Sequence, residues 1–513
     1  MKHPRSHASE DSVKLDTSTD PQVGYRPPGP LDVPSALAPY AGAFGRRQAA
    51  HLLRRGGFGG TPAEIDAAAA RGSQGAVDDL FHPRTPDGNF ADYPDTEALY
   101  DPKVRIATAQ MWWLDRMLRT QHPLAEKMAF FWHGHFATSI RKVPAQLMVA
   151  QIDLFRRQGL GNFRSLLLAV SKDPAMLVWL DNRANNKAHP NENYAREIME
   201  LFALGLGNYT EDDIKDAARA FTGWTLDKNL AFIFNAKAHD DGEKTVLGNT
   251  GNLTGEDVVA TIVRQPIHQR FICRKLLEYF VYSDPEPELI DALSQTYALS
   301  GFDIARTVAT IFRSNVFYSP RAYRALPKSP VEFVVGTLRF MNVAAIPKDT
   351  PYWLQRMGQD LLSPPSVKGW DGGPTWINTS TLLARLNYVN RIVKAAPPRA
   401  VAPPPMAAAQ ASSMAAMTMV TGAPNASVLA TYPALTPDVI VERSGGLSAA
   451  RVLATLVGDA VQDDVTSDFR TTLAAYLDST NATVPTPLSG ENYQDKIRGA
   501  LALVLQLPSN QLN

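Results

Sequence analysis

The chain has one cysteine, no long apolar run and no tract of basic residues, and each shortage excludes a class of protein. Because Cys273 is the only cysteine among 513 residues, the chain can form neither an internal disulfide bond nor a zinc site built on cysteines. No stretch of the sequence approaches the ~20 apolar residues that a membrane-spanning helix needs. The 51 basic and 51 acidic residues balance, so a nucleic-acid-binding surface has no electrostatic support.

Short catalytic signatures are also missing from the sequence. It contains no HExxH zinc motif, no Walker A loop, no GxGxxG after a strand, no nucleophile elbow and no EF-hand loop. Cys273 lies in the apolar stretch FICRKLLEYF and is expected to be an inert core residue. The first 30 residues lack the apolar segment of a signal peptide, which predicts a cytoplasmic protein. Export to the periplasm or the exterior with a signal-bearing partner, and a truncated start, are the alternatives.

Helix signals dominate the chain. Thr61, Pro62 and Glu64 supply an N-cap, a first-turn proline and a capping glutamate. Long amphipathic helices are expected over residues 103–120 and 123–150. Strands are few, so the predicted fold class is all-α. Further helices are expected from the cap at Thr210 to near Gly223, and over 255–264, 268–282, 286–299, 302–314, 328–343, 436–462 and 489–507.

Composition divides the chain into four predicted parts. Residues 1–44 are polar and proline-rich and are expected to form a disordered arm. Residues 45–393 form the main helical domain, with irregular loops or a small hairpin near 225–250. Residues 394–432, rich in Ala, Pro and Met, are expected to be a linker or insertion. Residues 433–513 are expected to form a helical segment that packs on the main domain.

The most unusual stretch is HPNENYAREIMEL, at residues 189–201. From Glu192 the pattern is helical, with apolar residues on one side and Glu192, Arg196 and Glu200 in one polar row. Asn193 and Glu197 form a second row. Carboxylates in such a ladder can bind a divalent cation or act as general acid and base. The alternative is a solvated face whose ion pairs contribute only tenths of a kcal/mol each. Only one row is expected to face a pocket.

Two histidines flank Gly134 in FWHGHF. On a helix, residues at i and i+2 lie about 200° apart, so His133 and His135 cannot both bind one metal ion. Glu126 and His133 share a face, so at most one histidine is expected to point into a site with Glu126. The alternative is a core helix whose histidines satisfy buried carbonyl groups.

Two loops offer further polar or aromatic groups. HDDGEK, at 239–244, supplies His239, Asp240 and Lys244 as ligands or proton carriers, unless Asp and Gly simply form the turn. KGWDGG, at 368–373, places Trp370 where it can stack on a planar ligand, unless the ring only anchors the loop.

These segments are expected to converge on one polar pocket. A divalent metal ion is the candidate cofactor. The catalytic candidates are Glu192, Glu197, His133, His239 and Asp240; the substrate-binding candidates are Arg196, Asn193, Lys244 and Trp370; the metal-binding candidates are His133, His135, His189 and Glu197.

Five blocks of the sequence together resemble a bacterial family catalogued as domain of unknown function 1800. They occur in the family's order, cover roughly residues 45–393, and are followed by C-terminal helices similar to the family's tail. Members are often exported, whereas this chain lacks a visible signal. The blocks are PLAEKMAFFWHGHFAT (123–138), HPNENYAREIMELFALGLGNYTEDDIKDAARAFTGW (189–224), HDDGEKTVLG (239–248), LPKSPVEFVVGTLR (326–339) and MGQDLLSPPSVKGWDGGPTWINTSTLLARLN (357–387).

The resemblance also implies a partner. Genes of the family often lie beside one for a second uncharacterised family, numbered 1501, whose members look like sulfatases or alkaline phosphatases and typically carry a twin-arginine signal. Two functions follow as hypotheses. The first is a hydrolase or lyase acting on a polar or glycan-like substrate, in which Glu197 or Glu192 is the acid or base, His133 or His239 is its partner, and Arg196 and Lys244 hold an anionic group. The second is a non-catalytic accessory subunit of that partner, in which the polar residues form a structural network and the arm and linker dock.

Overall fold

A computed structural model describes residues 32–84, 87, 94–394, 435–478, 488–490 and 492–513. It is 61% helical, with 22 α-helices and two small antiparallel sheets in the described residues, so the all-α prediction is confirmed. Within the same residues, no helix combines the length and the apolar character needed to span a bilayer. Residues 1–31 of the predicted arm and 395–432 of the predicted linker lie outside the described residues. Residues 33–37 of the predicted arm form a short helix.

The first half of the described chain contains twelve α-helices, the three short helices η1 to η3 and both hairpins. They are α1 (Val33–Leu37), α2 (Arg46–Gly56), α3 (Pro62–Phe81), α4 (Thr96–Tyr100), α5 (Arg105–Arg119), α6 (Pro123–His135), α7 (Ala145–Gln158), α8 (Phe163–Ser171), α9 (Pro174–Trp179), η1 (Asn182–Ala184), α10 (Glu192–Glu197), the π-helical η2 (Ile198–Ala203), α11 (Glu211–Ala220), β1 (Trp224–Leu226), β2 (Phe232–Phe234), η3 (Ala236–Ala238), β3 (Lys244–Val246), β4 (Asn249–Gly251) and α12 (Gly255–Arg264).

In the second half of the described chain, every labelled element is a helix. Its elements are α13 (Pro266–Phe280), α14 (Pro287–Leu299), α15 (Ile304–Arg313), α16 (Pro330–Phe340), α17 (Thr350–Arg356), η4 (Gly373–Trp376), α18 (Thr379–Lys394), α20 (Pro437–Arg443), α21 (Ala449–Val461), α22 (Ser467–Asp478), α23 (Tyr493–Leu505) and η6 (Pro508–Gln511).

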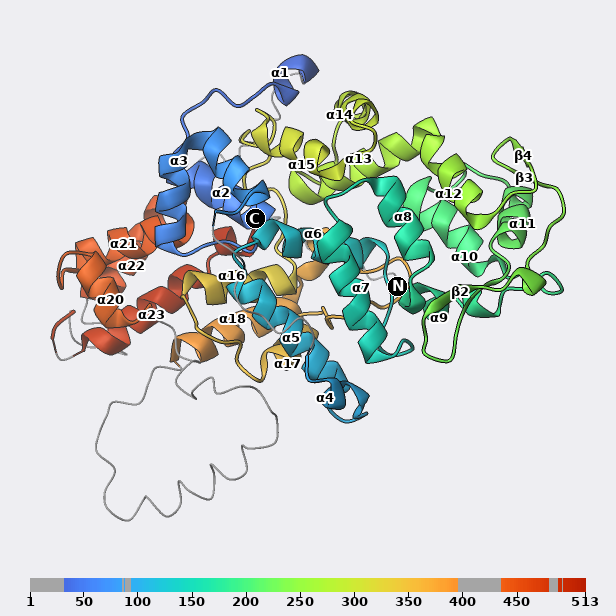
Figure 1. Ribbon diagram of the computed structural model, residues 1–513. Helices are drawn as coiled ribbons and strands as arrows, with labels where there is room; N and C mark the ends of the chain where they lie inside the picture. The colour runs from blue at the N-terminus through green and yellow to red at the C-terminus, as the bar shows by residue number, and fades with distance from the viewer. Residues whose placement is uncertain (1–31, 85–86, 88–93, 395–434, 479–487, 491) are drawn as a thin grey trace, which may run out of the picture.

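The helices surround one extended core that runs the length of the molecule. Helices α20 to α23 lie beside α2 and α3 at one end, and α10 to α12 with the hairpins lie at the other (Figure 1). Helices α5 to α9 fill the middle, and the C-terminal end of the chain lies beside α2 (Figure 1). One continuous cluster of buried apolar side chains connects α1 through α23. The C-terminal helices therefore share the core of the preceding ones, with α23 packed against α18.

Helix caps lie where the sequence predicts them. The Thr61 side chain accepts a hydrogen bond from the Glu64 backbone N–H, and the Glu64 carboxylate accepts one from the Thr61 N–H, 2.7 Å away. Thr210 forms the same reciprocal pair with Asp213 at the start of α11. Each pair satisfies backbone donors that the first helical turn leaves free. Helix α11 ends at Ala220, close to the predicted end at Gly223.

The single helix predicted over residues 123–150 is wrong. Helix α6 ends at His135 and α7 begins at Ala145, with an irregular segment between them. Pro144 is the N-cap of α7, and a proline in that place cannot donate the backbone hydrogen bond that a continuous helix requires. Tertiary contacts hold the segment: the Ile140 N–H donates to the Leu362 carbonyl at 2.9 Å, and the Thr138 hydroxyl donates to the Gln151 side chain.

The predicted hairpin region contains two hairpins. Strand β1 pairs antiparallel with β2, with Trp224 opposite Phe234, and β3 pairs with β4, with Lys244 opposite Gly251. Between β3 and β4, Leu247 and Gly248 both have positive φ, as the tight hairpin turns that follow strand twist require.

A buried carboxylate joins α5, α6 and α7. Glu126 is 1% exposed and accepts hydrogen bonds from the Trp113 indole at 3.0 Å, from Arg116 Nε at 2.9 Å and from Arg156. Burial of a charged group is costly unless the group is paired and hydrogen-bonded, and Glu126 satisfies both conditions.

Removing this carboxylate should destabilise the protein strongly. We expect Glu126→Ala to lower the free energy of unfolding by about 3 kcal/mol, because two guanidinium groups lose a buried counter-charge. Asp115→Ala, which breaks the exposed Asp115–Arg119 pair on α5, is the matched control and should cost under about 1 kcal/mol. Urea unfolding followed by circular dichroism measures both, and equal losses would contradict the assignment.

Candidate functional site

His133 lies in the core and not on a wetted surface. Its side chain is fully buried, with its ring 5.3 Å from that of Trp113 and 5.6 Å from that of Trp370, measured between centroids. Neither ring nitrogen has a hydrogen-bond partner in the described structure. Burial lowers the pKa of His133 from 6.5 to about 3, so the imidazole is neutral at physiological pH.

The KGWDGG loop covers His133 by a close backbone approach. Gly369 has φ +84°, and a Cβ at this position would lie 2.4 Å from the Gly134 carbonyl oxygen. Only glycine accommodates that contact, which places the half-buried Trp370 against the imidazole. The second histidine of the motif points elsewhere: His135 Nε2 donates to the Phe202 carbonyl at 2.9 Å, and burial lowers its pKa to about 3.

The polar face of HPNENYAREIMEL is occupied by contacts within the chain. Asn191 caps α10 by accepting from the Asn193 N–H. Arg196 donates to Glu211 of α11 at 2.8 Å through two nitrogens and to Glu192 at 3.2 Å. These groups are partly exposed, so the pairs tie α10 to α11 without much net stabilisation. The remaining polar candidates of this stretch, His189 and Asn193, are exposed.

Glu197 differs from the other candidates. It lies at the end of α10, where the chain passes into the π-helical turn η2. Burial, and then the charge of Glu200, raise the pKa of the Glu197 carboxyl group, while Arg196 opposes the shift. The Glu200 carboxylate accepts a hydrogen bond from the Tyr209 hydroxyl at 2.5 Å. π-helical turns are frequent at functional sites, so Glu197, with Glu200 beside it, remains a candidate site residue.

The HDDGEK loop packs on the C-terminal end of α11. His239 is buried, and its Nδ1 donates to the Thr222 carbonyl at 2.9 Å. Asp240 accepts from Arg219 through both oxygens, and these hydrogen bonds lower the pKa of its carboxyl group. Lys244 donates to the Gly242 carbonyl at 2.9 Å and is 1% exposed, and burial lowers its pKa.

A sequence profile of the family described as protein of unknown function (DUF1800) matches residues 51–512, nearly the whole chain. The chain belongs to this family. No curated protein and no solved structure matches it. The match continues past residue 393, so the C-terminal helices belong to the family's region together with the five motif blocks.

Three of the predicted site residues have different immediate neighbours. His133 lies against Trp113 and Trp370, Glu197 lies beside Glu200, and His239 is held by Thr222. Where the chain is described, no group of three or more His, Cys, Asp or Glu side chains is placed to hold a metal ion. The four metal-binding candidates, His133, His135, His189 and Glu197, accordingly do not form a metal site together.

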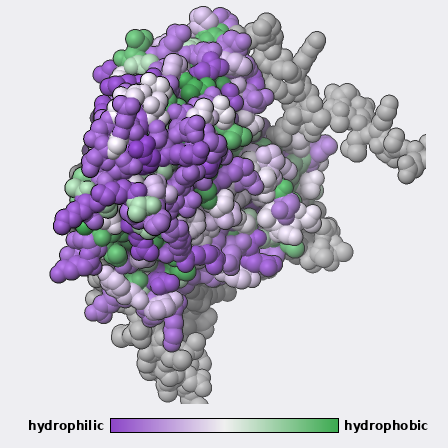
Figure 2. Space-filling view, turned by 90° about the vertical axis from the view of Figure 1, so that its right-hand side faces the viewer, coloured by the Kyte–Doolittle hydropathy of each residue, from purple (hydrophilic) through white to green (hydrophobic). Residues whose placement is uncertain are grey.

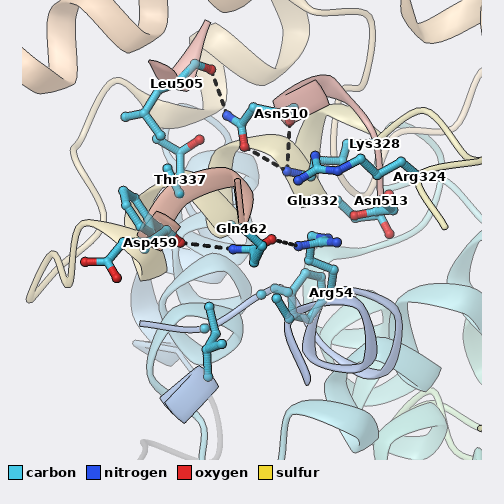
Figure 3. Close-up of a pocket in the computed structure, with 18 residues that line it drawn as sticks. Arg54, Arg324, Lys328, Glu332, Thr337, Asp459, Gln462, Leu505, Asn510 and Asn513 are labelled. Carbon is cyan, nitrogen blue, oxygen red and sulfur yellow. Dashed lines mark hydrogen bonds between the residues drawn. The ribbon is translucent and has the colours of Figure 1, made fainter. Parts of the chain in front are cut away.

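A pocket elsewhere is lined partly by the block LPKSPVEFVVGTLR (326–339), none of whose residues is among the predicted site residues. It lies between α2, α16 and the C-terminal helices, and its wall includes Arg54, Lys328 and Glu332 (Figure 3). Arg54 is far in the sequence from Lys328 and Glu332, so no local spacing brings it to them. Two local signals exist: Lys328 and Glu332 lie four residues apart at the start of α16, and in α2 the sequence RRQAAHLLRRG places arginines on a helix that is buried on most sides.

The lowered pKa of His133 leads to a prediction of how the free energy of unfolding changes at low pH. The pKa is about 3 in the folded state and near 6.5 when unfolded, so between these values the unfolded chain binds more protons. The stability that the neutral ring permits is complete above pH 6.5 and is lost as the pH falls towards 3. At pH 4 the loss should approach roughly 3 kcal/mol. We expect His133→Phe to reduce the loss of stability between pH 7 and pH 4 by about 3 kcal/mol, with the share of His135 remaining, whereas His189→Gln, at an exposed position, leaves the whole loss in place. Urea unfolding at pH 7 and pH 4 measures the difference, and identical losses in all three proteins would disprove the role of burial.

Proposed function

We propose that the chain is a non-catalytic accessory subunit of a protein partner that resembles sulfatases or alkaline phosphatases. The observation that carries this proposal is the use of the polar motif residues within the chain itself. Arg196 is shared between Glu192 and Glu211, Asp240 is held by Arg219, and His239 is held by Thr222. Such groups stabilise the junction of α10, α11 and the hairpins, and they are not free to accept a proton from a substrate.

The surface over these elements favours a polar partner. Figure 2 shows the face that carries α10, α11 and the hairpins: it is mostly hydrophilic, with hydrophobic residues scattered singly. Large apolar patches mark obligate interfaces, whereas a charged surface suits a partner recognised by complementary charge. The first turn of α11 contributes Glu211, Asp212 and Asp213 to this surface.

A second candidate function, a hydrolase or lyase acting on a polar substrate, rests on Glu197 alone. Its carboxyl group is half-buried, its pKa is raised, and a second carboxylate with a tyrosine hydroxyl is beside it. A carboxyl group with a raised pKa can donate a proton at neutral pH, and its neighbour can remain ionised as the base. In this hypothesis Glu197 is the general acid, and Glu200, held by Tyr209, is the group that accepts a proton.

Co-expression of the chain with that partner separates the two functions. The accessory hypothesis predicts a 1:1 complex, by size-exclusion chromatography with light scattering, for the parent and for Glu197→Gln alike. It also predicts that removing residues 1–31 or 395–434 weakens the complex, since these segments are the proposed docking elements.

Glu197→Gln should also leave the fold intact. Replacing a half-buried carboxylate of raised pKa by a neutral amide should raise the free energy of unfolding at pH 7 by less than about 1 kcal/mol. The exposed Glu288→Gln on α14 is the control and should change nothing. If the parent hydrolyses or eliminates a polar substrate and Glu197→Gln abolishes that activity with fold and complex intact, the chain is the enzyme and the accessory proposal is wrong.

A further inference from the structure

The pocket between the two halves of the chain is lined by side chains from four places. Arg54 comes from α2, Arg324 and Lys328 from the segment before α16, Gln462 from the end of α21, and Asn510 from η6 (Figure 3). Its apolar wall includes Phe58, Ile65 and Phe340. The cavity has a volume of about 40 Å³ and is partly open to solvent.

Buried cations outnumber carboxylates in and next to this pocket. Arg54, Arg324 and Lys328 line it, and the equally enclosed Arg55, Lys127 and Arg385 lie next to them, all six at most 8% exposed. Glu332, Asp459 and the last residue, Asn513, also line it, and Asp459 is paired with Arg46 and Arg443. Glu332 pairs with Lys127, and Asp464 pairs with Arg324 at 2.7 Å. In the part of the chain that the structure describes, the other four have no carboxylate within 4.0 Å. Buried charges are normally paired, so four unpaired cations call for an explanation.

The hydrogen-bonding groups of these cations are only partly used. Arg54 donates through Nη1 to the Gln462 side chain at 2.9 Å, but its Nε and Nη2 have no acceptor. Arg55 donates through Nη2 to the carbonyls of Val281 and Ala322, and its Nε and Nη1 are likewise without an acceptor. Lys328 donates to Asn510, at 2.8 Å to the carbonyl and 3.2 Å to the side chain. The free edge of Arg54 is a pair of donors of the kind that binds an oxyanion through two oxygens.

The pKa values of the neighbouring groups report the same excess of positive charge. Burial lowers the pKa of Lys328 well below its usual value, and the charges of Arg54 and Arg324 lower it further. Burial alone would raise the pKa of the Tyr323 hydroxyl, yet Arg54 and Arg324 bring it below its usual value. Both shifts indicate a positive potential that an anion would reduce.

We propose that this pocket binds a compact tetrahedral oxyanion, phosphate or sulfate, either free or as the ester group of a larger molecule. The free Nε–H and Nη2–H of Arg54 hold two of its oxygens, and the ammonium group of Lys328 holds another. The opening to solvent leaves room for the rest of an ester. This site is separate from the accessory role proposed above and does not depend on it.

Binding at this place also has a structural consequence. Arg54 belongs to α2, near the start of the domain, and Gln462 and Asn510 belong to the C-terminal helices. An anion between them neutralises charges that otherwise repel one another across the junction. It therefore stabilises the folded chain by RT ln(1 + c/Kd), which increases with the concentration c of the free anion.

Isothermal titration calorimetry with inorganic phosphate, in a buffer without other oxyanions and at constant ionic strength, tests the proposal on the full chain. We expect saturable 1:1 binding of phosphate, and about tenfold weaker binding after Arg54→Lys, which keeps the charge but loses the two parallel donors. Arg54→Met should abolish binding. Arg71→Met, which removes an exposed arginine of α3 paired with Asp79, should leave it unchanged. Glycerol 3-phosphate distinguishes the sources: tighter binding than phosphate indicates an ester ligand, and weaker binding indicates the free ion.

The melting temperature provides a second readout that a purely structural arginine would not give. In chloride alone, we expect the Tm of Arg54→Met to equal or exceed that of the parent, because a buried cation without a counter-charge has been removed. Phosphate should raise the Tm of the parent, by an amount that grows with the logarithm of its concentration above the Kd, and raise that of Arg54→Met only by the general salting-out effect. Lys328→Met should behave in the same way and replaces Arg54→Met if that variant does not fold. No saturable binding of phosphate, sulfate or the ester, or full binding by the variants, overturns the proposal.

Discussion

Glu126 shows how this protein buries charge, and the surroundings of the family's histidine motif depend on it. Its carboxylate is enclosed by Arg116, Arg156 and the indole of Trp113, so α5, α6 and α7 meet around a neutralised charge. Because Trp113 is fixed by that hydrogen bond, its ring forms one wall around His133, and Trp370 forms another. The imidazole of this motif histidine is thereby kept neutral and away from solvent.

In and beside the cationic pocket, by contrast, buried charges are not neutralised within the chain. Arg54, Arg55, Lys328 and Arg385 are at most 8% exposed, yet no carboxylate of the described chain pairs with them. A charge left in that condition raises the free energy of the folded state unless a ligand supplies the missing counter-charge. The cost of burying an unpaired charge thus distinguishes Glu126, whose charge is neutralised within the fold, from the four cations, which we propose are neutralised by a ligand.

Sequence patterns predict local structure well here and predict the site poorly. The capping residues Thr61 and Thr210 and the scarcity of strands are local signals, and they give the helix starts and the all-α class. The break between α6 and α7 was missed because amphipathic spacing resumes after Pro144, which hides the interruption. The partners of His133 and Arg54 come from distant parts of the chain. No spacing within a motif can show that a polar side chain finds its partner inside the protein.

The central claim is that ligand binding belongs to the cationic pocket, whereas the polar motifs are structural. Hydrogen–deuterium exchange with and without inorganic phosphate tests this most directly, since it reports local opening along the whole chain. The account predicts phosphate-dependent protection in α2, in residues 324–340 and in the segments around Gln462 and Asn510, with none in residues 189–200 or 239–244. Protection confined to residues 189–200 and 239–244 would contradict the account and would indicate that the motif residues bind the ligand.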